Sequence, residues 1–229
     1  MMQTQDRSPE AGAVRTPYYR LLSGQYDTET ALGGRLLTQL DAGDTDRLKR
    51  AGIVDLTLLP RVGYRGLGAE AFLRDQSTLL PETPNQSTVQ PLGELALRLS
   101  PTEFWLLGSL QDLGQRVAQM PLQHRDTPAH CYPLFCEDSH AWFALTGDYI
   151  EQVMAKLCAV DLREKAFPVG AIAQTSVART NCIVVRHQIR ELPCFSILSD
   201  ISSSEYLLTV LQDAVAEYQG GLCGIAPLL

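Results

Sequence analysis

The chain has 229 residues, of which 45% are hydrophobic and 20% charged, and its formal net charge is -7. This composition is ordinary for a globular protein with a sizeable buried core, and the length suits one large domain or two small fused ones. The acidic balance, spread without long single-sign runs, argues against nucleic acid as a partner, because binding phosphate requires a basic face.

The sequence also argues against export and against membrane insertion. No apolar stretch is long enough to span a bilayer, and residues 1–15 lack the apolar segment of a secretory signal. The six cysteines are irregularly spaced, which is typical of reduced thiols rather than of a disulfide framework. We therefore expect a soluble, cytoplasmic protein.

Residues 1–45 are predicted to form an N-terminal arm that is partly disordered or docks on a partner. The first 16 residues are polar, whereas Tyr18, Tyr19, Leu21 and Leu22 are apolar for a free end. Leucines in Thr28–Leu40 have helical spacing despite two internal glycines, each of which costs about 1 kcal/mol. Residues 46–229 are predicted to form the folded domain.

The first half of this domain, about 46–125, begins with a predicted strand at Ile53–Leu59. A glycine-rich turn region at Gly63–Gly68 precedes a short helix at Ala69–Leu79. Pro81–Pro91 contains three prolines and is predicted to be a surface loop.

A hairpin and a helix complete this half. Glu94–Leu99 and Glu103–Leu107 are predicted strands, and the intervening Ser-Pro-Thr is typical of a hairpin turn. Leu110–Val117 has the spacing of a helix, which Pro121 would end.

The second half, about 126–229, begins with a predicted proline-bounded loop at Thr127–Pro133. An extended segment follows at Leu134–Leu145. Asp148 and Glu151 have the spacing of a capping box, which would begin an amphipathic helix that ends near Cys158.

Three successive strands are predicted at Ala171–Val177, Asn181–Arg186 and Cys194–Leu198. A second capping box, Ser202 with Glu205, precedes the final helix. These elements predict an α+β fold with two similar halves of mainly antiparallel strands covered by helices.

The apolar tail, Gly220–Leu229, has no place in this repeated pattern. Together with the N-terminal arm, it is predicted to dock on a partner chain.

No short motif of a catalytic or cofactor site is present. The glycines at Gly63–Gly68 are in the wrong order for a dinucleotide fingerprint, and the sequence contains neither a nucleophile elbow nor a His-Glu-x-x-His pair. Asp55, Glu94 and Asp161 lie near glycines or strand ends, where a turn contact is the favoured interpretation. We therefore expect no catalytic residues on this chain.

A histidine- and cysteine-rich segment is the strongest candidate for a metal site. Thiolates and imidazoles so close together could bind zinc in a tetrahedral site. The irregular spacing and the predicted strand favour packing instead, because free cysteines are commonly buried without being ligands. The residues concerned are His124, His130, Cys131, Cys136 and His140.

Longer runs of residues resemble a known family. The chain is similar to the gamma subunit of heterotetrameric sarcosine oxidase, and to the related aminomethyltransferase (glycine-cleavage T protein) superfamily. The resemblance covers about residues 50–219, and the matching front-half runs are Ala51–Thr57 and Tyr64–Leu73. The back-half runs are Ala144–Gly147, Val153–Leu162, Ala166–Gly170, Gln174–Asn181 and Ile183–Arg186.

The resemblance implies the folate-binding aminomethyltransferase-like fold and a set of family-signature residues with structural or interface roles. Arg179 and Arg186 are predicted to project from strands, either toward an internal carboxylate or toward a partner. The full set is Asp55, Gly66, Gly147, Asp161, Phe167, Pro168, Gly170, Arg179 and Arg186.

The sequence departs from the folate-using members at three places. Those members have an Asp in the strand that corresponds to Gly93–Leu97, where this chain has Glu94 or Gly93, and an Asn where it has Gly108-Ser109. They also follow the strand-ending Arg with Gly-Glu-x-Gly-x-Glu, whereas here Arg186 is followed by His187–Glu191. The fold is therefore predicted to be retained and the folate site lost.

The resemblance implies a cofactor-free, gamma-type subunit of a complex that oxidatively demethylates an N-methyl amine such as sarcosine. FAD, FMN, NAD, tetrahydrofolate and zinc would then be bound by the larger flavin- and folate-binding subunits and by a small zinc-binding subunit. Two alternatives remain: a stand-alone folate-dependent transferase, and a binding protein that kept only the fold.

Overall fold

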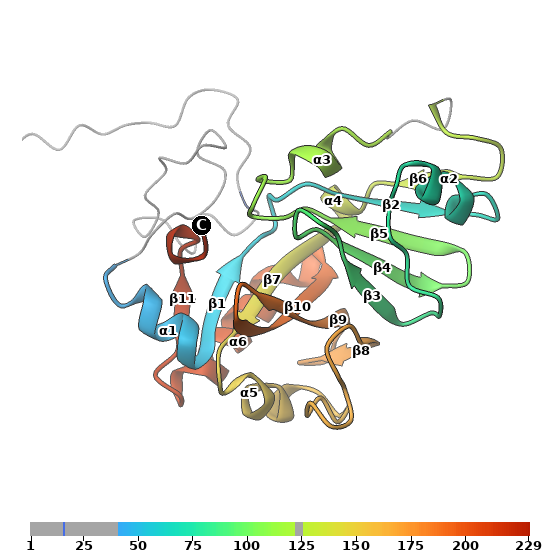
Figure 1. Cartoon of the computed structure of the whole chain (residues 1–229). Helices are drawn as coiled ribbons and strands as arrows, with labels where there is room; N and C mark the ends of the chain where they lie inside the picture. The colour runs from blue at the N-terminus through green and yellow to red at the C-terminus, as the bar shows by residue number, and fades with distance from the viewer. Residues whose placement is uncertain (1–15, 17–40, 122–125) are drawn as a thin grey trace, which may run out of the picture.

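Two β-sheets lie at the centre of the molecule (Figure 1). The computed structural model describes Thr16, residues 41–121 and residues 126–229. Within these residues, a six-stranded sheet has the order β11-β1-β7-β10-β9-β8, and a five-stranded sheet has the order β3-β4-β5-β2-β6. Paired strands are antiparallel except β1 and β11, which are parallel. The predicted α+β class with mainly antiparallel sheets is confirmed.

The six-stranded sheet collects strands from both ends of the described chain. Its strands are β1 (Gly52–Asp55), β7 (His140–Thr146), β8 (Ile172–Val177), β9 (Thr180–Ile189), β10 (Leu192–Asp200) and β11 (Gly221–Cys223). The elements that accompany it are α1 (Asp44–Ala51), α5 (Ile150–Leu157), η2 (Ile201–Ser203), α6 (Ser204–Ala216) and η3 (Ala226–Leu228).

The five-stranded sheet comes mainly from the middle of the chain. Its strands are β2 (Arg61–Arg65), β3 (Gln86–Val89), β4 (Leu95–Ser100), β5 (Glu103–Leu107) and β6 (Tyr132–Leu134). Three short helices accompany it: α2 (Ala69–Asp75), α3 (Gln115–Ala118) and α4 (Cys136–Ser139).

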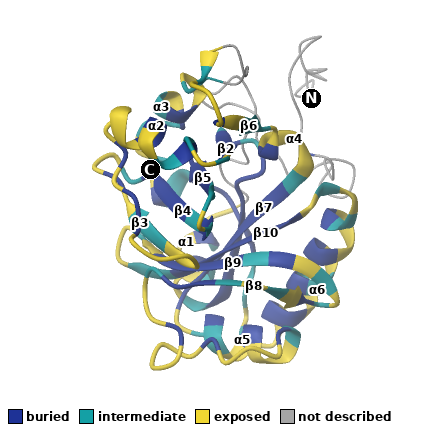
Figure 2. Ribbon diagram, turned by 90° about the vertical axis from the view of Figure 1, so that its right-hand side faces the viewer, coloured by how far each residue is buried: buried dark blue, intermediate teal, exposed yellow. Residues whose placement is uncertain are grey.

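Alternating strand side chains give each sheet two buried faces. In β5, Phe104 and Leu106 pack in the cluster that includes residues of α2, whereas Trp105 and Leu107 pack in the cluster between the sheets. The strands of the other sheet divide in the same way between this central cluster and the cluster with α5 and α6. The layers are therefore helices, sheet, sheet and helices, with the exposed surface of α5 and α6 facing outward (Figure 2).

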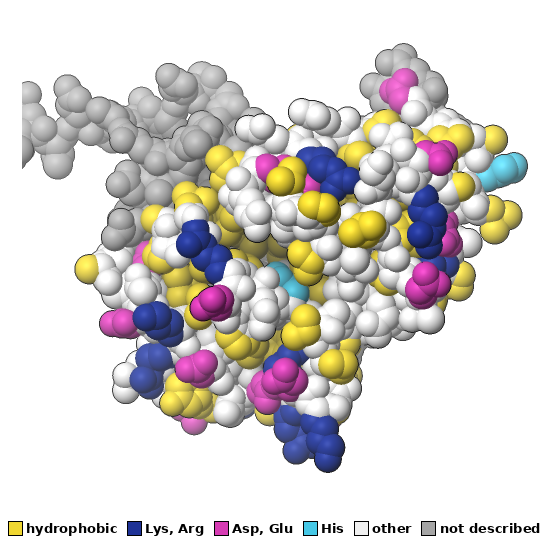
Figure 3. Space-filling view, viewed as in Figure 1, with side chains coloured by type: hydrophobic (Ala, Val, Ile, Leu, Met, Phe, Trp, Pro, Cys, Tyr) yellow, Lys and Arg dark blue, Asp and Glu magenta, His cyan; other side chains and the backbone are white. Residues whose placement is uncertain are grey.

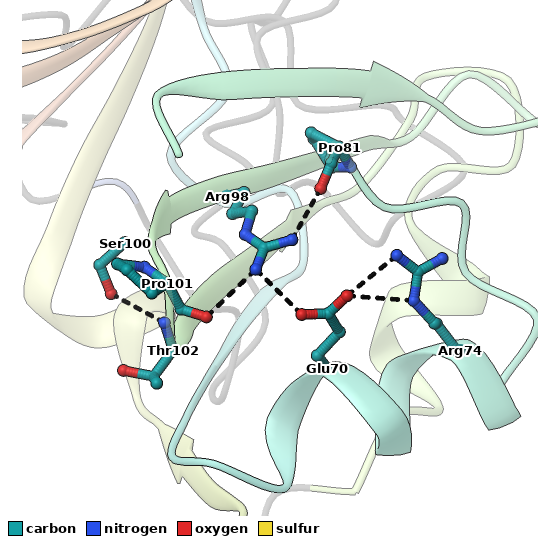
Figure 4. A network of polar contacts seen from close by, with 7 residues as sticks. All are labelled: Glu70, Arg74, Pro81, Arg98, Ser100, Pro101 and Thr102. Atoms are coloured by element: carbon teal, nitrogen blue, oxygen red, sulfur yellow. Dashed lines mark hydrogen bonds and ion pairs between the residues drawn. The ribbon is translucent and has the colours of Figure 1, made fainter. Parts of the chain in front are cut away.

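A partly buried arginine fixes α2 to the five-stranded sheet (Figure 4). Arg98 on β4 donates hydrogen bonds to Glu70 Oε2 at 2.9 Å and to the carbonyls of Pro81 at 3.0 Å and Pro101 at 3.3 Å. Glu70 also accepts from Arg74 Nη2 at 2.9 Å. The network joins the helix, the hairpin turn and the segment before β3.

The two sheets are also linked along one side through backbone groups near Gly170. Ser87 N on β3 donates to the Gly170 carbonyl at 2.7 Å, and Ile172 N on β8 donates to the Asn85 carbonyl at 2.9 Å. Gln174 Nε2 reaches the Leu99 carbonyl at 2.7 Å. These bonds hold β8 and the residues before it against β3 and β4 of the other sheet.

Most predicted elements are present, but several boundaries were wrong. The predicted loop Pro81–Pro91 contains β3, which pairs with β4, and the predicted turn region at Gly63–Gly68 begins inside β2. The extended segment Leu134–Leu145 is interrupted by α4. Only the end of the predicted helix Leu110–Val117 is helical, as α3. Contacts with other parts of the chain, such as the pairing of β2 with β5 and β6, decided these elements, and local residue preference did not reveal them.

Neither predicted capping box forms. Glu151 instead accepts from the backbone N–H of Glu164 at 2.8 Å and pairs with Arg186, while α5 follows Tyr149 without a side-chain cap. At the second site, Asp200 accepts from the backbone N–H of Ser202 at 2.8 Å and begins η2 ahead of α6. At each site, a residue of the predicted capping box is bound to another residue instead: Glu151 to Glu164 and Arg186, and Ser202 to Asp200.

The sheets do not coincide with residues 46–125 and 126–229, because β1 joins the sheet of the later residues and β6 joins that of the earlier ones. The tail was predicted to have no place in the pattern of strands and helices, which is wrong, whereas its docking on a partner stays a prediction. It forms β11 and η3, and its Leu222, Cys223, Ile225 and Leu228 are buried. The Thr28–Leu40 helix and the apolar residues of the arm lie outside the described residues.

Candidate functional site

A cleft of about 900 Å³ opens where the two sheets and the C-terminal tail meet. The molecular surface on this side is hollowed, with hydrophobic side chains around the hollow and a histidine within it (Figure 3). His187 is the histidine that lines the cleft. Concave, largely apolar clefts of this size are where proteins most often bind partners or ligands, so this is the candidate functional site.

Apolar side chains from both sheets form the lining. The buried ones include Leu56 and Leu59 after β1, Leu95 on β4, Trp142 on β7 and Leu228 in the tail. They belong to the cluster that fills the space between the sheets. The cleft is thus an opening into the central core layer.

Three neighbouring strands supply a buried hydrogen-bond chain beside the cleft. Trp142 Nε1 on β7 donates to Ser196 Oγ on β10 at 2.9 Å, and Ser196 Oγ lies 2.8 Å from His187 Nε2 on β9. Because the indole can only donate, the Ser196 hydroxyl is free to donate to His187 Nε2. The other ring nitrogen, Nδ1, then donates to the Gln188 carbonyl at 3.2 Å.

These hydrogen bonds use both ring nitrogens of His187, and the buried imidazole is neutral. Burial lowers the pKa of His187 to about 4, and the hydrogen bond to the Gln188 carbonyl raises it by a smaller amount. The side chain therefore serves as a fixed wall of the cleft and offers neither a free proton donor nor a charge to a ligand.

In the folate-using members, an Asp lies in the strand that corresponds to Gly93–Leu97. Here this segment presents no carboxylate to the cleft. Gly93 and Leu95 line it, whereas the buried Glu94 is bound by Arg116 Nη1 at 3.1 Å. Gly93 has φ +84°, and a Cβ at this position would lie 2.7 Å from Ser109 Oγ. Ser109 in turn accepts a hydrogen bond from the Gln111 backbone N–H at 3.0 Å.

The signature glycines occupy turns that a side chain would disturb. Gly66 follows β2 with φ +127°, and a Cβ there would lie 2.0 Å from the His130 carbonyl oxygen. Gly147 follows β7 with φ +107°, and its Cβ would lie 2.6 Å from the Arg50 backbone. Gly170 has φ +91° and makes the link between the sheets described above. These roles are conformational.

Arg186 binds an internal carboxylate. Its side chain is 6% exposed, its Nη1 lies 2.8 Å from Glu151 Oε1, and the same nitrogen donates to the Leu162 carbonyl at 2.9 Å. The guanidinium lies over the Phe195 ring at 5.4 Å from its centroid. Arg186 therefore joins β9 to α5 and to the segment that follows it.

Arg179 was wrongly predicted to project from a strand. It lies exposed in the two-residue turn between β8 and β9, with φ +67°. Both Ala178 and Arg179 have positive φ, as in the turns that join two hairpin strands tightly.

The other signature residues make local contacts. Asp55 accepts from the Thr57 backbone N–H at 2.9 Å, which turns the chain after β1. Asp161 pairs with Arg163 at 2.6 Å, and this hydrogen-bonded pairing lowers the pKa of Asp161 to about 2. Phe167 is buried against Phe195, with 6.2 Å between ring centroids, and the Pro168 carbonyl accepts from Ala171 N at 3.0 Å.

The histidine- and cysteine-rich segment separates into different environments. Cys131 is buried under the five-stranded sheet near α2, whereas Cys136 is buried in the cluster between the sheets. His140 packs edge-on against Trp105, with 4.8 Å between ring centroids. His124 lies outside the described residues; among those described, no group of three or more metal-binding side chains is present. The absence of a bound metal stays a prediction.

All six cysteines are free and buried. Burial raises the pKa of Cys136 and Cys223 to about 12, so these thiols are protonated near neutral pH. None of the helices in 41–121 and 126–229 combines the length and hydrophobicity that a bilayer span requires.

Comparison with known proteins locates this architecture among solved structures. No family model and no curated protein matches the sequence. The structure is similar to a chain of the heterotetrameric sarcosine oxidase from Corynebacterium sp. U-96 in complex with pyrrole 2-carboxylate. That match has a TM-score of 0.63 and 20% identity, and it covers 91% of this chain and 97% of that one.

A second similar structure is the glycine cleavage system aminomethyltransferase T from Bartonella henselae. Its TM-score is 0.71 and its identity 17%, and the match covers 94% of this chain but only 60% of that protein. The chain has an aminomethyltransferase-like fold. The structural neighbours agree with the relationship that the sequence resemblance predicted, and the predicted fold is confirmed.

Sequence reasoning named the family-signature residues but missed the cleft of this aminomethyltransferase-like fold. Trp142, Ser196 and Leu228 are far apart in sequence, and no spacing links them. The one available signal was His187, which follows Arg186 where folate-using members of the superfamily have glycine.

Proposed function

We propose that this chain is a cofactor-free, gamma-type subunit of a heteromeric sarcosine-oxidase-like flavoenzyme. The complex would oxidatively demethylate an N-methyl amine such as sarcosine in the cytoplasm. FAD, FMN, NAD, tetrahydrofolate and zinc would be bound by its partner subunits. The observation that carries this proposal is the shared fold over 91% of this chain and 97% of a chain of heterotetrameric sarcosine oxidase.

The chemistry of the cleft supports a subunit without its own folate. Recognition of a folate requires hydrogen-bonding groups directed at its polar ring and its glutamate. Here Glu94 is bound by Arg116, and His187, with both nitrogens used, replaces the glycine of the folate-using members. Without the Asp, the Asn and the Gly-Glu turn of the folate-using members, a bound folate would leave polar atoms unpaired, at about 1–3 kcal/mol each.

Co-expression tests the proposal directly. The chain is produced alone and together with the flavoprotein and zinc-binding subunits of a sarcosine-oxidase-like complex, and each preparation is analysed by size-exclusion chromatography with light scattering. Amine-dependent electron transfer is then measured with sarcosine. We expect a stoichiometric complex and no oxidation by the chain alone. A monomer that ignores those proteins would overturn the proposal, and so would one that oxidises sarcosine by itself.

A stand-alone folate-dependent transferase is the second candidate, and the higher TM-score of 0.71 to the aminomethyltransferase favours it. Calorimetric titration of the isolated chain with tetrahydrofolate separates the two candidates. We expect no binding in the micromolar range. Micromolar affinity, lost when Leu95→Asp places a charge in the cleft, would favour the transferase instead.

A further inference from the structure

The mouth of the cleft exposes large hydrophobic side chains. Val89 on β3 is 53% exposed, Val169 before β8 is 50% exposed and Leu229 in the tail is 54% exposed, and all three line the cleft. Single exposed hydrophobic residues are normal on a protein surface, but these surround one concavity and continue into its apolar floor. Together with that floor they form an apolar socket.

The rim of this socket is held by hydrogen bonds on two sides. Near Val89 and Val169, the Gly170 carbonyl accepts from Ser87 N at 2.7 Å and from Ser87 Oγ at 3.1 Å. On the tail side, Arg190 Nε in the β9–β10 turn donates to the Leu228 carbonyl at 2.9 Å. A rim fixed in this way loses little conformational entropy when a partner covers it.

The distribution of polarity favours a protein segment over a small molecule. Small-molecule sites combine an apolar wall with a few convergent polar groups. Among the polar residues of this lining, His187 and Ser109 are already used in hydrogen bonds within the chain. A small molecule bound at the floor of the cleft would also leave the side chains of Val89, Val169 and Leu229 exposed to water. A segment of another chain can fill the floor and cover the rim at once.

The charges around the socket indicate the chemistry of that segment. The charged side chains in its lining are Lys49, Arg190 and Glu191, of which two are cationic and one is acidic. Within residues 41–121 and 126–229, neither Lys49 nor Arg190 forms an ion pair. An acidic group beside the apolar insertion would complement them, which speeds and orients association.

We infer that this socket receives an apolar segment of a partner subunit that carries an acidic side chain next to the inserted residues. The inference rests on the proposed function, because it assigns the surface through which the chain joins the complex. An apolar insertion surrounded by covered rim residues is the arrangement in which a few contacts dominate binding.

Variants at the rim test the inference in the co-expressed complex and by titration of purified partners. Val89→Asp and Val169→Asp place a charge in the covered region, and Lys49→Glu reverses a rim charge. The matched control is Leu67→Asp, since Leu67 is 84% exposed and does not line the cleft. Thermal unfolding of each isolated variant verifies that it is folded.

We expect Val89→Asp and Val169→Asp each to weaken assembly by about tenfold or more, and Leu67→Asp to leave it unchanged. Lys49→Glu should slow association and reduce its dependence on salt. If the wild type assembles and folded rim variants assemble equally well, the inference is wrong while the proposed function stands. If the wild type does not assemble, both are wrong. Native mass spectrometry that finds a tightly held small molecule in the cleft of the isolated chain would also contradict the inference.

Discussion

Replacing Arg186 with methionine should destabilise the folded chain without touching the cleft. The substitution keeps an unbranched side chain in place but removes the charge that lies 2.8 Å from Glu151 Oε1. Breaking a buried ion pair typically costs 3–5 kcal/mol, because the remaining charge is left unpaired. Glu151 is 30% exposed, so part of its charge can be hydrated, and we expect a loss of about 3 kcal/mol.

Urea unfolding of the isolated chain, followed by circular dichroism, measures this loss. The double variant Arg186→Met with Glu151→Gln should recover about 1 kcal/mol or more, because it also removes the unpaired carboxylate. Arg163→Met is the control, since Arg163 forms an exposed pair with Asp161 and its replacement should leave the midpoint unchanged. An Arg186→Met variant of normal stability that fails to assemble would refute the reasoning, since Arg186 would then act at an interface.

Three further measurements follow from individual residues. Because burial lowers the pKa of His187 to about 4, the unfolded chain binds this proton first as the pH falls. The wild type should therefore lose about 3 kcal/mol between pH 6.5 and 4 relative to His187→Gln, and equal pH profiles would contradict the buried neutral histidine. Gly66→Ala, whose Cβ would lie 2.0 Å from a carbonyl oxygen at φ +127°, should lower the melting temperature far more than Gly221→Ala, whose nearest contact is a flexible side chain at 3.2 Å. Elemental analysis should find no stoichiometric zinc, and one zinc per chain that is lost on Cys131→Ala or Cys136→Ala would show that prediction wrong.

The local pattern of the sequence was sufficient for the elements with strong periodicity. The hairpin that became β4 and β5, the three long strands β8 to β10 and the helix α6 all follow from alternating or helical apolar spacing. The signature runs predicted the aminomethyltransferase-like fold, and the solved structures agree. Side chains that are buried on one or two faces of an element recur at regular intervals in the sequence, which is why these predictions succeeded.

Short edge elements were missed because their stability comes from distant partners. β3 pairs with β4 and is held by Gly170, and β11 lies parallel to β1, whose sequence position is far away. Three or four residues are too few to show a period, so the sequence suggested a loop at β3 and a tail outside the pattern of strands and helices at β11.

The sequence by itself determined which residues are apolar, which glycines are available for turns and which family the runs resemble. Only the tertiary structure decided that Arg186 binds Glu151, that Glu94 is bound by Arg116, and that Trp142, Ser196 and His187 form one chain of hydrogen bonds. Each of these contacts joins residues that different strands, or a strand and a helix, bring together. Their pairing depends on which strands and helices lie side by side in the fold, which the local pattern of the sequence does not show.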